Sequence, residues 1–165
     1  MASIVVEIRE PIPEEAEALA RCQLDCWQET YADLVDPARL GDLLGRVDER
    51  VERWREILVG PSRHRVASDD GKLVGFASVG SPRDEDAVTA LELFALYTRR
   101  SHWGTGLGHR LLQDALGDAP ATLWVLRDNE RARRFYAAHG FVPDGAEQEE
   151  WHFRGVEIRM VREGS

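Results

Sequence analysis

The sequence predicts an α/β fold with one mixed sheet flanked by helices, and two observations predict it. First, segments with alternating apolar residues, as in strands, are interleaved with segments whose apolar residues recur every three or four positions, as in helices. Second, an apolar run that ends at Tyr97 passes through a glycine-rich turn into a helical segment that begins at Leu107. A chain of 165 residues can build one substantial core, so we expect a single domain over 1–165.

The first half of the chain is expected to hold a strand, three helices and a hairpin. Alternation predicts the first strand at 4–9. Helical spacing predicts three helices, over 13–31, 37–44 and 47–58. Asp70-Gly71 favours a tight turn and joins two expected strands, at 64–68 and 72–79. The charged segment 81–86 follows, and we expect it to be mobile.

The second half is expected to alternate between strands and helices. Apolar runs and alternation predict four strands, at 87–97, 122–126, 141–142 and 156–160. Helical spacing predicts two helices, over 107–116 and 130–139. Asp128-Asn129 can cap the start of the last helix, and Gly140 can end it.

The glycine-rich turn before Leu107 predicts a phosphate-binding site. Its backbone N–H groups and the positive end of the helix dipole point at one small volume. A nucleoside-triphosphate loop needs Lys and Ser or Thr after its last glycine, but His109-Arg110 follow Gly108. A dinucleotide fingerprint needs G-x-G-x-x-G, one residue longer than this G-x-G-x-G. From the glycines alone, a turn without a ligand stays open.

Two segments separated by an apolar strand resemble motifs of one known family. Residues 103–108 read W-G-T-G-L-G, and residues 129–136 read N-E-R-A-R-R-F-Y, closed by Gly140-Phe141. They are similar to the acetyl-coenzyme A loop, Q/R-x-x-G-x-G/A, and to the N-x-x-A-x-x-F-Y…G-F element of the GNAT superfamily of N-acetyltransferases. The clear match covers about residues 73–142. The chain departs from the family at Trp103, where Gln or Arg is common, and at Arg99-Arg100, where x-Pro is frequent.

This resemblance implies a fold, an activity and a cosubstrate. The fold is a single-domain GNAT-like one with a mixed, mostly antiparallel sheet, in the order β-α-α-β-β-β-α-β-α-β-β. The activity is N-acetyl transfer from acetyl-coenzyme A. The residues expected to bind this cosubstrate are Leu96, Tyr97, Thr98, Trp103, Gly104, Thr105, Gly106, Leu107, Gly108, His109, Asn129, Ala132, Phe135 and Tyr136. Residues 96–98 would pair with the pantetheine arm like an added strand, and Asn129 would either bind that arm or cap its helix.

Acetyl transfer to an amine also needs a base and an acid. Glu92, on the strand that leads to the loop, is the predicted general base, with a purely structural place in a hydrogen-bond network as the alternative. The resemblance implies that Tyr136 lies near the coenzyme sulfur and donates a proton to the leaving thiolate. A phenol suits this role because its pKa near 10 keeps the proton at neutral pH. The alternative is a packed core aromatic.

The acceptor is expected to be a primary amine of a small molecule, attacked directly in a ternary complex. A protein N-terminus, a lysine, or a catalytically silent acyl-coenzyme A-binding domain are the alternatives. Trp27 and Tyr31 are expected to wall the acceptor site, and Trp54, the 81–86 loop and residues 151–153 could contribute. The same aromatic side chains could instead belong to the core or to a homodimer interface.

Composition narrows the partners and the compartment. Twenty-one basic and thirty acidic residues give a net charge of −9, which argues against binding to nucleic acid or to an anionic membrane. No apolar run approaches the length of a membrane span, and no basic-then-apolar leader begins the chain. Cys22 and Cys26 could be half of a zinc site, but no second pair of Cys or His completes it. Reduced thiols, no metal and a cytoplasmic location are therefore expected.

Overall fold

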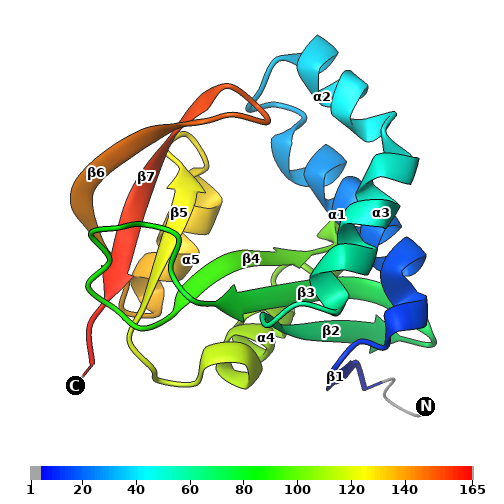
Figure 1. Cartoon of the computed structure of the whole chain (residues 1–165), viewed down its shortest axis with the longest axis horizontal. Helices are drawn as coiled ribbons and strands as arrows, with labels where there is room; N and C mark the ends of the chain where they lie inside the picture. The colour runs from blue at the N-terminus through cyan, green and yellow to red at the C-terminus, as the bar shows by residue number, and fades with distance from the viewer. Residues whose placement is uncertain (1–4, 165) are drawn as a thin grey trace.

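In residues 5–164, which the computed structural model describes, seven strands form one sheet in the order β1-β2-β3-β4-β5-β7-β6 (Figure 1). The predicted strand residue Ile4 lies outside the described residues. The strands are β1 (Glu7–Arg9), β2 (Arg63–Asp69), β3 (Lys72–Gly80), β4 (Glu92–Thr98), β5 (Ala121–Leu126), β6 (Val142–Glu150) and β7 (Gly155–Arg162). Every neighbouring pair is antiparallel except β4 and β5, which are parallel. The predicted mixed, mostly antiparallel sheet is therefore confirmed.

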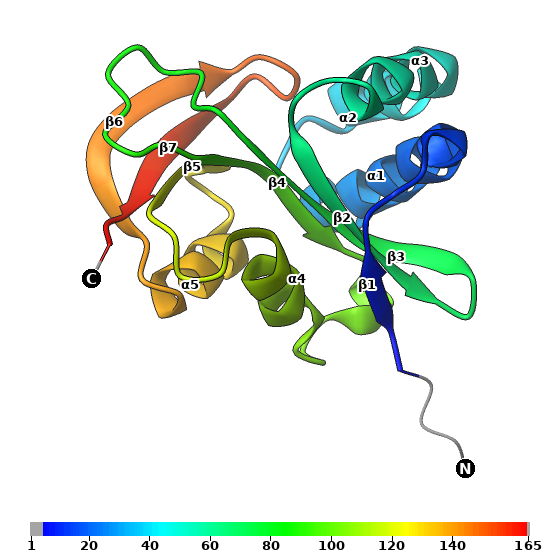
Figure 2. The ribbon, with the colours of Figure 1, turned by 60° about the horizontal axis from the view of Figure 1, so that its bottom comes forward.

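Helices cover both faces of the sheet (Figure 2). They are α1 (Ala16–Tyr31), α2 (Pro37–Leu44), α3 (Val47–Leu58), α4 (Leu107–Leu116) and α5 (Glu130–Ala138), with short 3-10 turns at Pro13–Glu15 and Arg100–His102. The first three helices precede β2, one more than the two that the family order implies, as the helical periodicity predicts. None of the helices in the described part of the chain is long and apolar enough to cross a membrane.

Strand residues point to opposite faces of the sheet and form separate parts of the core. Strict alternation is interrupted where the β2–β3 register shifts at Ala67/Ser68, so Val74 and Phe76 lie on opposite faces although they are two residues apart. Val66 and Phe76 pack with α1 and α3, where the Trp54 indole N–H donates a 2.9 Å hydrogen bond to Gln23. On the other face, Ala67 and Val74 pack against Leu107 and Leu111 of α4. The apolar stripe of each helix is thus buried against its own face of the sheet.

The parallel pair β4–β5 is very short. Only Glu92 and Leu93 pair with β5, opposite Thr122 and Leu123. A bulge follows, because the register between β3 and β4 shifts at Ser78/Val79. Beyond it β4 continues along β3 and separates from β5, so the sheet opens into a V.

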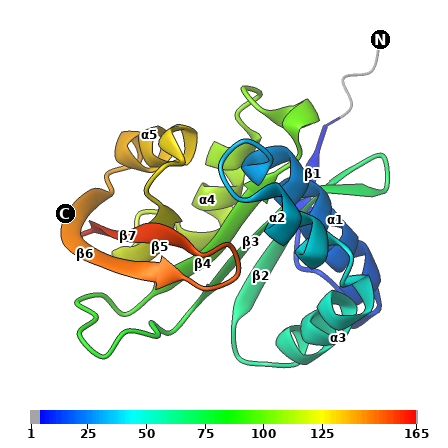
Figure 3. The same cartoon turned by 90° about the horizontal axis from the view of Figure 1, so that it is seen from above.

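The β6–β7 hairpin reaches across the top of this V (Figures 1 and 3). Its tip residue Phe153 packs in one cluster with Trp27 and Tyr31 of α1. Arg39 of α2 donates hydrogen bonds to the carbonyl oxygens of Trp151 and His152, at 3.3 and 2.6 Å. These contacts fix the hairpin over one end of the opening.

The segment 81–86, which the sequence predicts to be mobile, is tied to the sheet by its side chains. The Trp124 indole donates a 2.9 Å hydrogen bond to Asp84, and Arg159 forms an ion pair with Asp86 at 2.7 Å. Arg83 bonds to Glu92 of β4. Arg83, Asp84 and Asp86, whose charges suggest a free loop in the sequence, are instead bonded to residues of β4, β5 and β7.

Candidate active site

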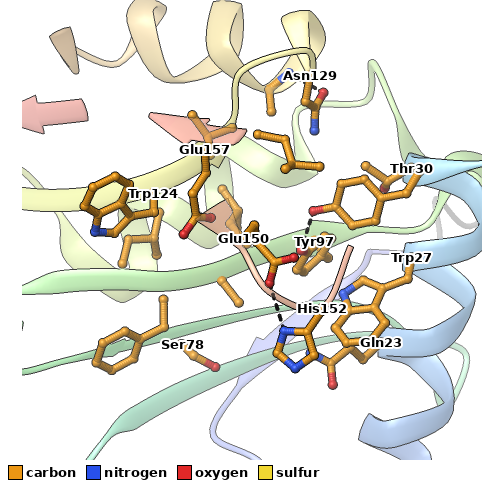
Figure 4. A pocket seen from close by; sticks show the side chains of 18 of the residues that line it. Gln23, Trp27, Thr30, Ser78, Tyr97, Trp124, Asn129, Glu150, His152 and Glu157 are labelled. Atoms are coloured by element: carbon orange, nitrogen blue, oxygen red, sulfur yellow. Dashed lines mark hydrogen bonds and ion pairs between the residues drawn. The ribbon is translucent and has the colours of Figure 1, made fainter. Parts of the chain in front are cut away.

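A cleft of about 890 Å³ lies where β4 and β5 separate. Its loop end, next to α4 and α5, is lined by Leu96, Thr98, Gly108, Asn129, Ala132, Phe135 and Tyr136. Its hairpin end, between α1, α3 and the β6–β7 hairpin, is lined by Gln23, Trp27, Arg50, Glu150, His152 and Glu157, among others. Figure 4 shows many of these side chains facing one shared space. The cleft brings together residues from both halves of the chain.

The glycine-rich turn meets the loop end of the cleft at the start of α4. Gly104 and Gly106 have φ of +74° and +87°, in the left-handed region that favours glycine. A Cβ at either position would meet nothing within 4 Å, so the space in front of the turn is open. The first N–H groups of α4 have no acceptor within the helix. The N–H of Trp103 is different, because it already donates to Arg100 O at 3.1 Å.

The Trp103 ring holds two arginine side chains at this end of the cleft. Its indole N–H donates a 3.0 Å hydrogen bond to the Thr98 carbonyl, so that oxygen already has a partner. The guanidinium carbons of Arg131 and Arg100 lie 3.6 and 5.2 Å from the centroid of the Trp103 ring. Burial lowers the pKa of Arg131. Trp103, where the family motif commonly has Gln or Arg, therefore holds two guanidinium groups beside the loop.

Two further groups offer polar contacts beside the loop. Residues Ala95 to Thr98 of β4 pair with β3 on one side, and within residues 5–164 they have no strand partner on the other. Asn129 is buried and caps α5, since its side-chain oxygen accepts a 3.2 Å hydrogen bond from Ala132 N. Helix capping occupies the oxygen but leaves the side-chain NH₂ group as a donor. The two alternatives for Asn129 are thus compatible.

Tyr136, the predicted acid, lies on α5 at the loop end of the cleft. Its ring packs edge-on against Phe135 and Phe141, at interplanar angles of 74° and 68°, and the side chain is 8% exposed. Within residues 5–164 its hydroxyl has no hydrogen-bond partner. Burial raises the pKa of this phenol, and the neighbouring Tyr97 adds to the rise. A protonated hydroxyl without a partner is available to a group bound in the cleft.

Glu92 does not line the cleft. Its carboxylate is fully buried and accepts two hydrogen bonds of 3.0 Å, from the main-chain N–H and from Nε of Arg83, and a third from Nη2. These bonds occupy both oxygens. The geometry favours the structural alternative over the predicted role of Glu92 as a general base.

The structure shows two carboxylates that the sequence reasoning missed, Glu150 and Glu157. Both line the cleft, and their side chains point into it in Figure 4. Burial would raise the pKa of Glu150, but hydrogen bonds from His152 at 2.8 Å and from Phe153 N at 2.7 Å lower it. Burial raises the pKa of Glu157, and the nearby Glu150 adds to the rise. Of these two carboxylates, only Glu157 has a pKa raised toward neutrality, as a general base requires.

Trp27 and Tyr31, the predicted acceptor residues, also line the cleft. The hydroxyl of Tyr31 is 2.6 Å from that of Tyr97 on β4. Burial raises the pKa of Tyr31, and it raises that of Tyr97 to about 12. The Trp27 ring packs edge-on against Phe153, with centroids 5.2 Å apart. Both side chains therefore serve the core as well as the cleft wall.

Comparisons with known proteins agree with this architecture. The sequence matches the acetyltransferase (GNAT) family over residues 17–141. An uncharacterized N-acetyltransferase of Bacillus subtilis is 27% identical, over 95% of this chain and 91% of that protein. A mycothiol acetyltransferase of Acidimicrobium ferrooxidans is 32% identical, over 85% of this chain but only 51% of that protein. The crystal structure of PaiA N-acetyltransferase from Thermoplasma acidophilum, in complex with coenzyme A, has a similar fold, with a TM-score of 0.75 at 21% identity over 96% of this chain and 99% of that one.

Proposed function

The chain belongs to the GNAT family of acetyltransferases, and from this premise we propose that it transfers an acetyl group from acetyl-coenzyme A to a primary amine of a small molecule. Both substrates occupy the cleft together, and the amine attacks the thioester directly. The coenzyme lies at the loop end, and the acceptor lies at the hairpin end. The enzyme is thus an acyltransferase that forms a ternary complex.

The coenzyme is held mainly by backbone groups. The N–H groups of residues 104–109 bind its diphosphate at the positive end of α4, and Arg100 and Arg131 beside Trp103 add charge. Leu96, Tyr97 and Thr98 pair with the pantetheine arm along the free edge of β4, and the side-chain NH₂ group of Asn129 donates to it. Ala132 and Phe135 form the apolar wall. Each neutral hydrogen bond contributes about 0.5–1.5 kcal/mol.

The reaction needs one base and one acid. An amine with a pKa of about 10.4 is only about one part in 2,500 neutral at pH 7. Glu157, directly or through a water, takes the proton that the ammonium must lose, and the neutral nitrogen attacks the thioester carbonyl. The C–S bond then breaks, and the Tyr136 hydroxyl donates its proton to the departing thiolate. The proton that the attack leaves on the nitrogen passes, directly or through a water, to the Tyr136 phenolate and restores the hydroxyl. In this proposal Glu92 holds Arg83 in place and is not the base.

One observation carries the proposal: the start of α4, the free edge of β4 and the unpartnered Tyr136 hydroxyl meet in one cleft. The test measures thiol release from acetyl-coenzyme A with polyamines, aminoglycosides, amino acids and peptides. Turnover with at least one amine is expected, and Tyr136→Phe should lower kcat about 100-fold or more with little change in coenzyme affinity. Full activity in Tyr136→Phe would remove the phenol from the mechanism.

The same panel separates the alternatives. A protein acetyltransferase would turn over peptides far faster than free small amines, whereas a silent acyl-coenzyme A-binding domain would bind the coenzyme tightly and acetylate nothing. Trp27 and Tyr31 are proposed to wall the acceptor, so their replacement should raise KM for the amine.

A homodimer is also proposed, and light scattering at several concentrations tests it.

A further inference from the structure

Arg50 on α3 is a cation in the cleft without an anionic partner. Its side chain lines the hairpin end. Within residues 5–164 no carboxylate lies within 4.0 Å of its guanidinium, and its side chain makes no hydrogen bond. Two other arginines of the same helix are paired, Arg53 with Glu56 and Arg55 with Glu52. Arg50 therefore differs from its neighbours in a way that surface solvation does not explain, since it is half-buried.

The position of Arg50 is fixed by an aromatic platform. The guanidinium carbon lies 4.6 Å from the centroid of the Trp27 ring, and Trp27 is itself buried against Phe153. A guanidinium that stacks on a ring by its face keeps its N–H edge free for a second group. Burial lowers the pKa of Arg50, and the like charge of Arg53 adds to the effect. An anion bound at this edge would relieve both penalties.

The opposite wall of the hairpin end carries negative charge. Glu150 and Glu157 of the β6–β7 hairpin face the same space (Figure 4). A ligand with only positive groups would be attracted to these carboxylates but would be repelled by Arg50. A ligand with only an amine would leave the guanidinium desolvated and unpaired, which is costly. A molecule with both an ammonium and a carboxylate satisfies both walls.

We propose that the acceptor is a small amine that also carries a carboxylate, and that Arg50 binds this carboxylate while the amine faces Glu157 and Tyr136. This inference rests on the proposed function and adds the chemical class of the acceptor. Free amino acids and short peptides with a free carboxyl end both have this chemistry. A guanidinium and a carboxylate form a planar, bidentate pair with two parallel hydrogen bonds. This geometry selects acceptors with a carboxylate over acceptors without one.

Matched acids and amides test the proposal. Each L-amino acid and several dipeptides are compared with their own C-terminal amides as acceptors, with acetyl-coenzyme A and thiol release as the readout. Loss of a charge-assisted bond corresponds to about a 10- to 100-fold effect. For the best acceptor we expect kcat/KM of the acid to exceed that of the amide by this factor, mainly through KM. If a free amino acid is the best acceptor, the carboxylate is that of an amino acid; if a dipeptide is best, it is the carboxyl end of a peptide.

Variants of two arginines on α3 assign the effect to one side chain. Arg50→Gln should bring the acid-to-amide ratio toward one, and Arg50→Lys should keep part of the preference, because lysine retains the charge but not the planar fork. Arg55→Gln, on the exposed side of the same helix, should keep the full ratio. Coenzyme titration of each variant checks that the fold is intact.

The outcomes separate this inference from the proposed function. Equal turnover of acids and amides, a preference for amides or polyamines, or an unchanged ratio in Arg50→Gln would overturn the inference while leaving the acetyltransferase assignment in place. An absence of turnover with every amine, acids and amides alike, would overturn both.

Discussion

Arg83 and Glu92 form an ion pair in which the carboxylate is completely buried and the guanidinium is at the surface. Three donors of Arg83 bond to the two oxygens of Glu92. The guanidinium also lies 5.0 Å from the centroid of the Phe94 ring. The pair joins the 81–86 segment to the start of β4, next to the point where the sheet opens.

Removal of the guanidinium should therefore destabilise the fold. In Arg83→Met the buried carboxylate keeps only its bond to the main-chain N–H, so we expect a loss of about 2–4 kcal/mol of unfolding free energy. Urea denaturation measures it. The double variant Arg83→Met/Glu92→Gln should recover part of the loss, since an uncharged amide is less costly to bury. Wild-type stability in Arg83→Met would show that water solvates Glu92 in place of Arg83.

Isosteric replacement can decide whether Glu92, which the sequence predicts as the base, or Glu157, which lines the cleft, accepts the proton. Glu157→Gln should lower kcat/KM about 100-fold or more, because it removes the general base. Glu92→Gln should lower it less than about tenfold, because Glu92 contacts Arg83 and not the cleft. Steady-state kinetics on folded variants, checked by circular dichroism, gives the answer. The reverse order of effects would restore Glu92 as the base.

A carboxylate placed in the phosphate space should block the coenzyme. Gly106→Glu puts a negative charge at the start of α4, where a side chain meets open space, and should weaken coenzyme A binding about tenfold or more. Gly145→Glu is the matched control. Gly145 has φ of +92° against +87° for Gly106, with nothing within 4 Å in either case. Both variants carry a strain of about 1–2 kcal/mol, so calorimetry that shows equal affinities would argue against this loop as the diphosphate site.

Local signals explain what the sequence predicts well. The glycine-rich loop, the apolar period of α4 and the cap of α5 at Asn129 each depend on residues close together in the chain. The sequence alone therefore predicts the loop and both helices. The placement of Glu157 is not local. β7 is last in the chain but pairs between β5 and β6, and this order of strands brings Glu157 to the cleft. Arg50 and Trp27 likewise meet through helix packing, which periodicity does not specify.

The titration of Glu157 should be visible in the stability of the protein. Burial, helped by Glu150 and opposed by Gln148 and Arg83, raises the pKa of Glu157 above 4.5. The folded state thus binds this proton more tightly than the unfolded state. The stabilisation that comes from binding this proton is fully present when the pH is below the pKa of Glu157 in the unfolded chain. It is lost as the pH rises through the pKa of Glu157 in the folded protein. Glu157→Gln removes the charge, so its unfolding free energy relative to wild type should rise between pH 4 and pH 8.

Chemical denaturation at several pH values measures this difference. Glu147→Gln, an exposed position of the same hairpin, is the control and should differ little from wild type at any pH. The sign is the decisive part, because a carboxylate held by cationic partners would give the opposite trend, with the variant losing stability as pH rises. A difference between Glu157→Gln and wild type that is constant across the range would mean that Glu157 is solvated in the folded protein. A solvated carboxylate has an ordinary pKa and is a weak base at neutral pH, so the same data bear on its catalytic role.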